Sequence, residues 1–109
     1  MSQTAYLGFG ISIMANVVVN SKTIIDDGVI LNTSCSVDHD CKISTGVHIS
    51  PGAHLAGCVS VGSCSWLGIG SVIIQGKVIG HNSIVGAGSV VIKDIPNNVT
   101  VVGVPSKIV

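Results

Sequence analysis

The sequence contains no arginine and no glutamate, and charged residues make up only 9% of its 109 positions. Aromatic residues are also scarce, at 3%, although 47% of the chain is hydrophobic. Helical proteins depend on glutamate, arginine and leucine, so this composition argues against a mainly helical fold. Valine, isoleucine, serine and glycine are abundant instead, and they favour strands joined by tight corners.

The chain also lacks a cluster of positive charge and a long apolar run. Its formal net charge is zero and its lysines are scattered, so a nucleic-acid partner is not expected. No basic segment precedes an apolar one near the N-terminus, and polar residues interrupt every apolar run after a few positions. We therefore expect no membrane span and a cytoplasmic location for a single domain of residues 1–109.

Four cysteines are present, at intervals that do not resemble a zinc-binding motif. Cys35, Cys41, Cys58 and Cys64 are separated by five, sixteen and five residues, whereas zinc knuckles use short paired spacings. Cysteine commonly serves as a small buried residue. The sequence therefore predicts reduced cysteines in small-residue positions and no metal site.

A branched aliphatic residue recurs at every sixth position from Leu7 to Val91 without a miss. A second series, two residues earlier in each hexad, is small or β-branched at nearly every step, and Cys35 and Cys41 belong to it. The residue after each aliphatic is mostly small or turn-tolerant. A period of six fits neither a helix nor a lone strand.

This period predicts a solenoid in which three hexads close one coil, with residues eighteen apart stacking about 4.8 Å from each other. The predicted fold is all-β, a parallel β-helix of about five triangular coils over residues 5–92. After Val91 the rhythm stops, and residues 93–109 are expected to form a C-terminal cap. Within it we expect a turn at Pro96 and Asn97 and a short strand over Val99 to Val102.

Several aliphatic residues fall outside both inward series and would face water in a single solenoid. A trimer of packed solenoids would bury such surfaces, and we therefore expect a homotrimer. The aliphatics concerned are Ile24, Ile30, Val72, Ile74, Val78 and Ile84.

Three of the four histidines lie between Val37 and Gly57, inside the repeat. His39 falls at a corner, where its ring can take a proton from an amine or hydroxyl, and Asp40 can fix its tautomer. Gly57 stacks eighteen residues after His39, and its N–H could stabilise an oxyanion. Local chemistry alone favours a solvated corner histidine at position 39, and it is equally consistent with a plain corner glycine and an oxyanion donor at position 57.

The segments ILNTSCSVDHDCKIS, VHISPGAHLAG, VGAGSVVIKDIP and VGVPSK resemble the hexapeptide-repeat acyltransferases, in particular the sialic acid O-acetyltransferase and nucleotide-linked 4-amino-sugar N-acetyltransferase group. The resemblance covers nearly the whole chain. It implies a left-handed β-helix, whereas general crossover rules would give a right-handed one. It also implies a trimer that moves an acetyl group from acetyl-CoA to an amino or hydroxyl group of a sugar, and does not distinguish the two acceptors.

The resemblance assigns roles to individual residues. His39 matches the catalytic base, with Asp40 beside it, and direct attack on the thioester needs no covalent intermediate. Asn32 is expected to line the acceptor pocket. His54 and His81 match no functional position. The residues expected to bind acetyl-CoA are His48 at the thioester carbonyl, Gly57 in the acetyl region, Ile69 and Ala87 along the pantetheine groove, and Lys93 and Lys107 near the phosphates.

Members of this group usually begin with a separate sugar-nucleotide-binding domain, whereas here the repeats begin almost at Met1. The sequence thus predicts the catalytic half alone. Two other functions fit the fold. A metal hydratase of the γ-carbonic anhydrase type could use His39, His48 and His54 from two subunits, although the arginine of that family is absent. A non-catalytic scaffold or binding protein is the third.

Overall fold

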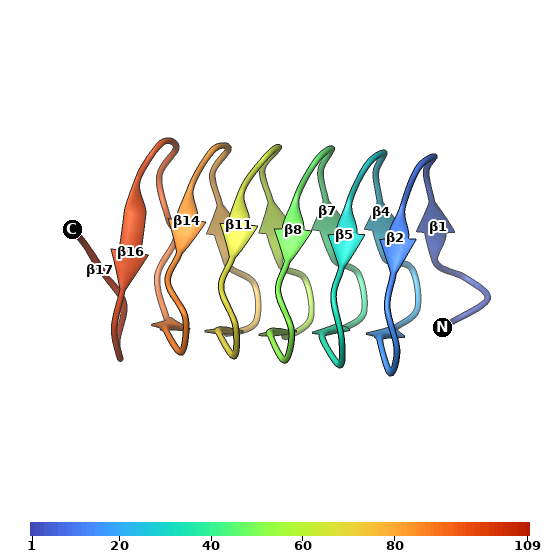
Figure 1. Cartoon of the computed structure of the whole chain (residues 1–109), viewed down its shortest axis with the longest axis horizontal. Helices are drawn as coiled ribbons and strands as arrows, with labels where there is room; N and C mark the ends of the chain where they lie inside the picture. The colour runs from blue at the N-terminus through green and yellow to red at the C-terminus, as the bar shows by residue number, and fades with distance from the viewer.

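The chain folds as a left-handed β-helix. The computed structural model describes all residues 1–109 and contains β-strands but no helix. In Figure 1 the strands nearest the viewer run downward, the chain returns upward behind them, and the coils advance from right to left, which is the left-handed sense. The predicted fold class is therefore confirmed. No helix is present that is long and apolar enough to cross a membrane.

Three sheets form the three faces of the solenoid, and the chain visits them in turn. Sheet A contains β1 (Tyr6–Leu7), β4 (Ile24–Ile25), β7 (Lys42–Ile43), β10 (Ser60–Val61) and β13 (Val78–Ile79). Sheet B contains β2 (Ser12–Ile13), β5 (Ile30–Leu31), β8 (His48–Ile49), β11 (Trp66–Leu67), β14 (Ile84–Val85), β16 (Thr100–Val102) and β17 (Lys107–Ile108). Sheet C contains β3 (Val18–Val19), β6 (Ser36–Val37), β9 (His54–Leu55), β12 (Val72–Ile73) and β15 (Val90–Val91).

Within the five coils, parallel strands pair at the predicted offset of eighteen residues. Ile25, for example, lies opposite Leu7 on one side and Ile43 on the other. The second residue of each strand points inward, and from Val19 onward this series is buried. Leu7 and Ile13 are more than one-third exposed, because the first coil has a neighbour on one side only.

Each corner of the five coils contains one residue with positive φ, three positions after the inward aliphatic. Glycine, asparagine and aspartate tolerate this conformation best, and Asp40 (φ 56°) and Cys58 (φ 61°) adopt it. The positions directly after the inward aliphatics are small because of packing between coils, not because of φ. A Cβ on Gly62 would lie 2.5 Å from the backbone of Gly80, so small size there allows the coils to approach each other.

The second inward series ties the coils together through side-chain donors. Thr23 Oγ1 donates to the carbonyl of Asp38 at 2.7 Å, and the Cys41 thiol donates to that of Ala56 at 3.2 Å. Cys35 and Cys41 are buried, as predicted. Burial raises the pKa of Cys35 to about 11 and also raises that of Cys41.

Cys58 and Cys64 are free thiols, as predicted, but they are not buried. Both are exposed at positive-φ corner positions rather than in the inward series, because each lies three residues after an inward aliphatic. All four thiols are free. Two of them are therefore available to solvent.

The C-terminal segment continues the solenoid instead of abandoning its rhythm. Ile95 bridges Ile79 and Val101 pairs with Val85, both at an offset of sixteen. The sixth coil is thus shortened by two residues, and the inward series resumes at Ile95 and Val101, six positions apart. The predicted strand is present as β16, which pairs with the antiparallel strand β17.

Of the six outward aliphatics, five are exposed and Ile30 is half-buried. They are distributed over all three faces of the solenoid. Val78 and Ile84, for instance, are 49% and 48% exposed on sheets A and B. The apolar outer surface that motivated the trimer prediction is therefore present.

Candidate functional site

A histidine–aspartate pair occupies the corner between β6 and β7. The backbone N–H of His39 donates to Asp38 Oδ1 at 2.8 Å, which fixes the corner, and His39 Nδ1 lies 3.0 Å from Asp40 Oδ2. Both side chains of the pair are about half exposed, at 47% and 50%. Hydrogen bonds from the Asn20 side chain and from the His39 amide lower the pKa of Asp38. The ring is thus oriented by a carboxylate and still open to a ligand.

The imidazole of His39 lies directly over Gly57 in the adjacent coil, as the eighteen-residue spacing predicts. A Cβ on Gly57 would lie 2.5 Å from His39 Nε2, so the ring can occupy this place only above a glycine. Gly57 is buried, and its N–H donates to no protein acceptor. An unpaired donor therefore lies beside the imidazole.

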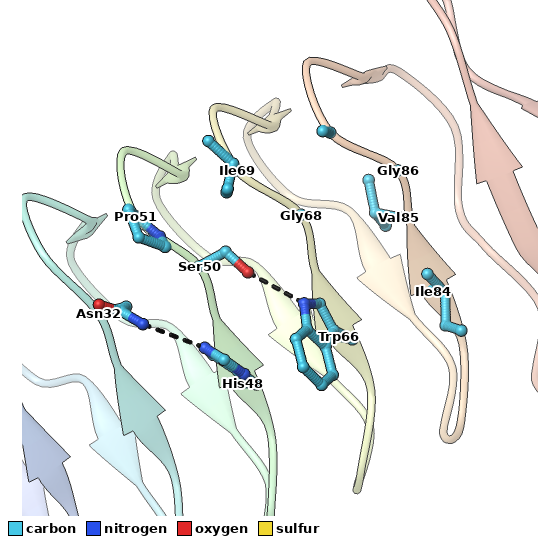
Figure 2. A pocket seen from close by; sticks show the side chains of 11 residues that line it. Asn32, His48, Ser50, Pro51, Trp66, Gly68, Ile69, Ile84, Val85 and Gly86 are labelled. Atoms are coloured by element: carbon cyan, nitrogen blue, oxygen red, sulfur yellow. Dashed lines mark hydrogen bonds between the residues drawn. The ribbon is translucent and has the colours of Figure 1, made fainter.

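A groove of about 420 Å³ runs along sheet B and its corner with sheet C. Figure 2 shows the side chains that line it, which come from successive coils. The residues that line it are Asn32, His48, Ser50, Pro51, Trp66, Gly68, Ile69, Ile84, Val85, Gly86 and Ala87. Four of the predicted positions, Asn32, His48, Ile69 and Ala87, therefore share one groove.

Neighbours on both sides determine the state of His48. The Thr33 N–H donates to Asn32 Oδ1 at 2.8 Å, which turns the Asn32 amide nitrogen toward His48 Nε2, at 3.4 Å. With Nε2 accepting, the proton of a neutral ring lies on Nδ1, which can donate to a ligand carbonyl. Partial burial lowers the pKa of His48 and so favours this neutral form.

The Trp66 ring packs against the other side of the His48 ring (Figure 2), with the two planes tilted by 43°. The ring centroids are 4.3 Å apart, and Trp66 Nε1 donates to Ser50 Oγ at 3.0 Å. The Trp66 side chain lines the groove and is 50% exposed. Trp66 was not among the predicted site residues, although it is the only tryptophan and stands eighteen positions after His48.

The two halves of the predicted site lie on different edges of one solenoid. His39, Gly57 and Lys93 follow sheet C and lie at its corner with sheet A, whereas His48 projects from sheet B. Lys107 is exposed on β17 at the C-terminal end of sheet B. A single chain thus keeps the histidine–aspartate pair apart from the groove.

The remaining histidines lie elsewhere. His54 is on sheet C, with its Nδ1 2.6 Å from Ser36 Oγ, and His81 lies at the corner between sheets A and B next to Asn82. His39, His48 and His54 therefore do not assemble a three-histidine site within one chain. The titratable group that does gather is His39, Asp40 and Cys58.

No protein-family model and no curated protein matches the chain. Several solved structures do match it. PerB from Caulobacter crescentus, in complex with CoA and GDP-perosamine, is 45% identical over 99% of this chain and 52% of its own, with a TM-score of 0.99. The acetyltransferase domain of PglB from Neisseria gonorrhoeae, in complex with acetyl coenzyme A, is 44% identical over 99% and 53%, with a TM-score of 0.98.

The chain is therefore similar in sequence and fold to acetyltransferases of known structure. A third relative, WeeI from Acinetobacter baumannii, is 31% identical over 99% of this chain and 56% of its own, with a TM-score of 0.87. The chain spans about half the length of these proteins. Two further structures are histidine variants of the Caulobacter N-acetyltransferase, with alanine or asparagine in place of one histidine, both with CoA and GDP-perosamine bound.

Proposed function

We propose that this chain is an acetyl-CoA-dependent acetyltransferase that modifies an amino or hydroxyl group of a sugar or sugar nucleotide. The observation that carries the proposal is the arrangement of His39. Its ring is oriented by Asp40 on one side and lies over an unpaired backbone donor, the N–H of Gly57, on the other. This combination provides a general base next to an oxyanion donor.

In this mechanism His39 Nε2 takes the proton from the acceptor as its nitrogen or oxygen attacks the thioester carbonyl. Asp40 holds the Nδ1 proton and stabilises the imidazolium that forms. The N–H of Gly57 donates to the oxyanion of the tetrahedral intermediate. When the carbon–sulfur bond breaks, His39 returns its proton to the departing thiolate.

Direct attack accounts for the chemistry without an acetylated enzyme. Cys41, two residues after His39, is buried and its thiol donates to the Ala56 carbonyl, so it does not face the site. The relatives from Caulobacter and Neisseria bind CoA or acetyl-CoA. For this chain the groove on sheet B offers the matching surface, with the Nδ1 proton of His48 directed to the thioester carbonyl and Ile69 and Ala87 along the pantetheine.

Because His39 and the groove lie on different edges, the proposal requires two chains for each active site. His39 and Gly57 of one subunit face the His48 groove of the next, and a closed trimer provides three equivalent junctions. Lys93 and Lys107 supply positive charge near the C-terminal end, where the phosphates of CoA would lie. Asn32 would contact the acceptor side of the same junction.

Calorimetric titration with acetyl-CoA, run alongside sedimentation, tests the donor. We expect saturable binding at about one site per subunit and weaker binding by His48→Ala, because the variant loses the donor to the thioester carbonyl. His54→Ala is a matched control, since His54 is exposed on sheet C and should leave binding unchanged. A folded trimer that binds no acetyl-CoA would refute the transferase and favour a scaffold.

Acetyl transfer is then followed by mass spectrometry of candidate acceptors, beginning with GDP-perosamine, the sugar nucleotide bound to PerB. Product detection by mass avoids thiol reagents, which would react with the exposed Cys58 and Cys64. His39→Ala should reduce the rate by about a hundredfold or more while retaining acetyl-CoA binding. An unchanged rate would remove His39 from the mechanism.

A further inference from the structure

One cluster of side chains that could bind a metal contains the catalytic pair together with a thiol that the mechanism does not use. His39, Asp40 and Cys58 each present a ligand atom, and these atoms all lie within 4.8 Å of one another. All three side chains are exposed, and Cys58 is a free thiol. No disulfide engages this thiol.

The backbone holds the three residues in place. Asp40 and Cys58 occupy equivalent positive-φ positions in adjacent coils, and the Cys58 N–H donates to the His39 carbonyl at 2.9 Å. His39 Nδ1 is already 3.0 Å from Asp40 Oδ2. Ligands in a tetrahedral zinc site lie about 3.3–3.8 Å from one another, given bonds of about 2.0–2.3 Å. Small rotations of exposed side chains therefore suffice.

We propose that His39, Asp40 and Cys58 form a zinc site that switches the enzyme off. An imidazole, a carboxylate and a thiolate are all ligands that zinc accepts, and water would complete the tetrahedron. Zinc at His39 Nδ1 replaces the contact with Asp40 and leaves the proton of the neutral ring on Nε2, so Nε2 cannot take a proton from the acceptor. The inhibitory effect rests on the proposed acetyltransferase function, whereas zinc binding does not.

The thiol makes this site distinct from the three-histidine alternative. His48 and His54 lie on sheets B and C and contribute nothing to the cluster. Zinc here would be an inhibitor that competes with catalysis, because its ligands are the catalytic pair themselves. Co²⁺, which accepts the same nitrogen, oxygen and sulfur ligands as Zn²⁺, should bind in the same way, whereas Mg²⁺ should not, because it prefers oxygen ligands.

The test is zinc binding by the reduced, full-length chain, measured by competition with a chromogenic chelator. Wild type should take up one Zn²⁺ per chain, and Cys58→Ser should bind at least about tenfold more weakly. Cys64→Ser is the matched control, since Cys64 is also an exposed, free thiol at a corner with φ 61°. Added Co²⁺ should give a thiolate-to-metal absorption band in wild type and Cys64→Ser only.

A second readout is the ratio of acetyl-transfer rates with and without Zn²⁺. Zn²⁺ should lower the rate about tenfold or more in wild type and Cys64→Ser, and much less in Cys58→Ser. Equal zinc affinity in all three proteins, or a cobalt spectrum without the thiolate band, would overturn the proposal. Zinc binding at this site in a protein with no transferase activity would uphold the site and refute the proposed function separately.

Discussion

At position 57 the side chain of a neighbouring residue, not the backbone conformation, requires glycine. The φ of Gly57 is ordinary, but a Cβ there would lie 2.5 Å from His39 Nε2. Gly57→Ala should therefore displace the imidazole and lower kcat/KM by about a hundredfold. Because the ring is exposed and free to rotate, the free energy of unfolding should change by about 1 kcal/mol or less.

Gly62→Ala provides the contrast. Its Cβ would meet the backbone of Gly80 and His81 at 2.5 Å, and backbone in a packed coil cannot rotate away. We expect a loss of stability of about 1–3 kcal/mol in urea unfolding, with the site chemistry intact in the folded fraction. A Gly57→Ala variant that is unstable but fully active would contradict the assignment of Gly57 to the site.

The depressed pKa of His48 makes a second prediction at this scale. Its folded-state pKa lies below the ordinary value of 6.5, so the unfolded chain takes up a proton at higher pH than the folded one. The contribution of neutral His48 to the free energy of unfolding is fully present above pH 6.5, and it is lost as the pH falls through the lowered pKa of the folded state. In urea unfolding between about pH 7.5 and pH 5, wild type should lose more stability than His48→Gln. Parallel curves would contradict the prediction.

At the scale of elements, the hexad series predicted the strands, their inward residues and the eighteen-residue stacking, because a solenoid core depends only on periodic aliphatic residues. Counting onward in sixes from Leu7 missed the sixth coil, since two residues are deleted before Ile95. The signal was present, because Ile95 and Val101 are themselves six apart. Counting in a fixed register of six from Leu7 does not detect this sixth coil.

The same spacing could have predicted more of the site. Trp66 follows His48, and Cys58 follows Asp40, each by eighteen positions. Spacing could not give the orientation of the Asn32 amide, which depends on a hydrogen bond from its own neighbour, Thr33. It also could not say that the His39 ring turns toward Gly57, because a corner side chain can adopt several rotamers.

Ile95 packs the shortened sixth coil against the rest of the solenoid, so replacing it should lower the stability of the protein. Ile95 is 7% exposed, and its backbone forms a β-bridge with Ile79. Ile95→Ala should cost about 2–4 kcal/mol, because it leaves a cavity at the covered end. Ile92→Ala removes the same atoms from a side chain that is 42% exposed, and should cost much less in the same urea titration. Similar losses would mean that Ile95 does not seal the core.

At the scale of the whole molecule, the outer surface and the divided site lead to the same assembly. Exposed aliphatic residues lie on all three faces, including Val72 on sheet C and Ile84 on sheet B. One edge carries His39 without a groove, and another carries the groove without a base. Under the proposed function, packing solenoids edge to face would cover apolar area and complete the site at once, and activity would then require an oligomer.

A mixture of two inactive variants tests this division directly. His39→Ala keeps the groove and His48→Ala keeps the base, so each alone should be nearly inactive. When they are unfolded together and refolded as mixed trimers, a junction is competent if its base comes from one variant and its groove from the other. In an equal mixture, half of the subunits have an intact His39 and the other half have an intact His48. About a quarter of the junctions then combine the two, so about a quarter of wild-type activity should return. If both halves of the site came from the same chain, every site would contain one of the two mutations, and mixing would restore nothing.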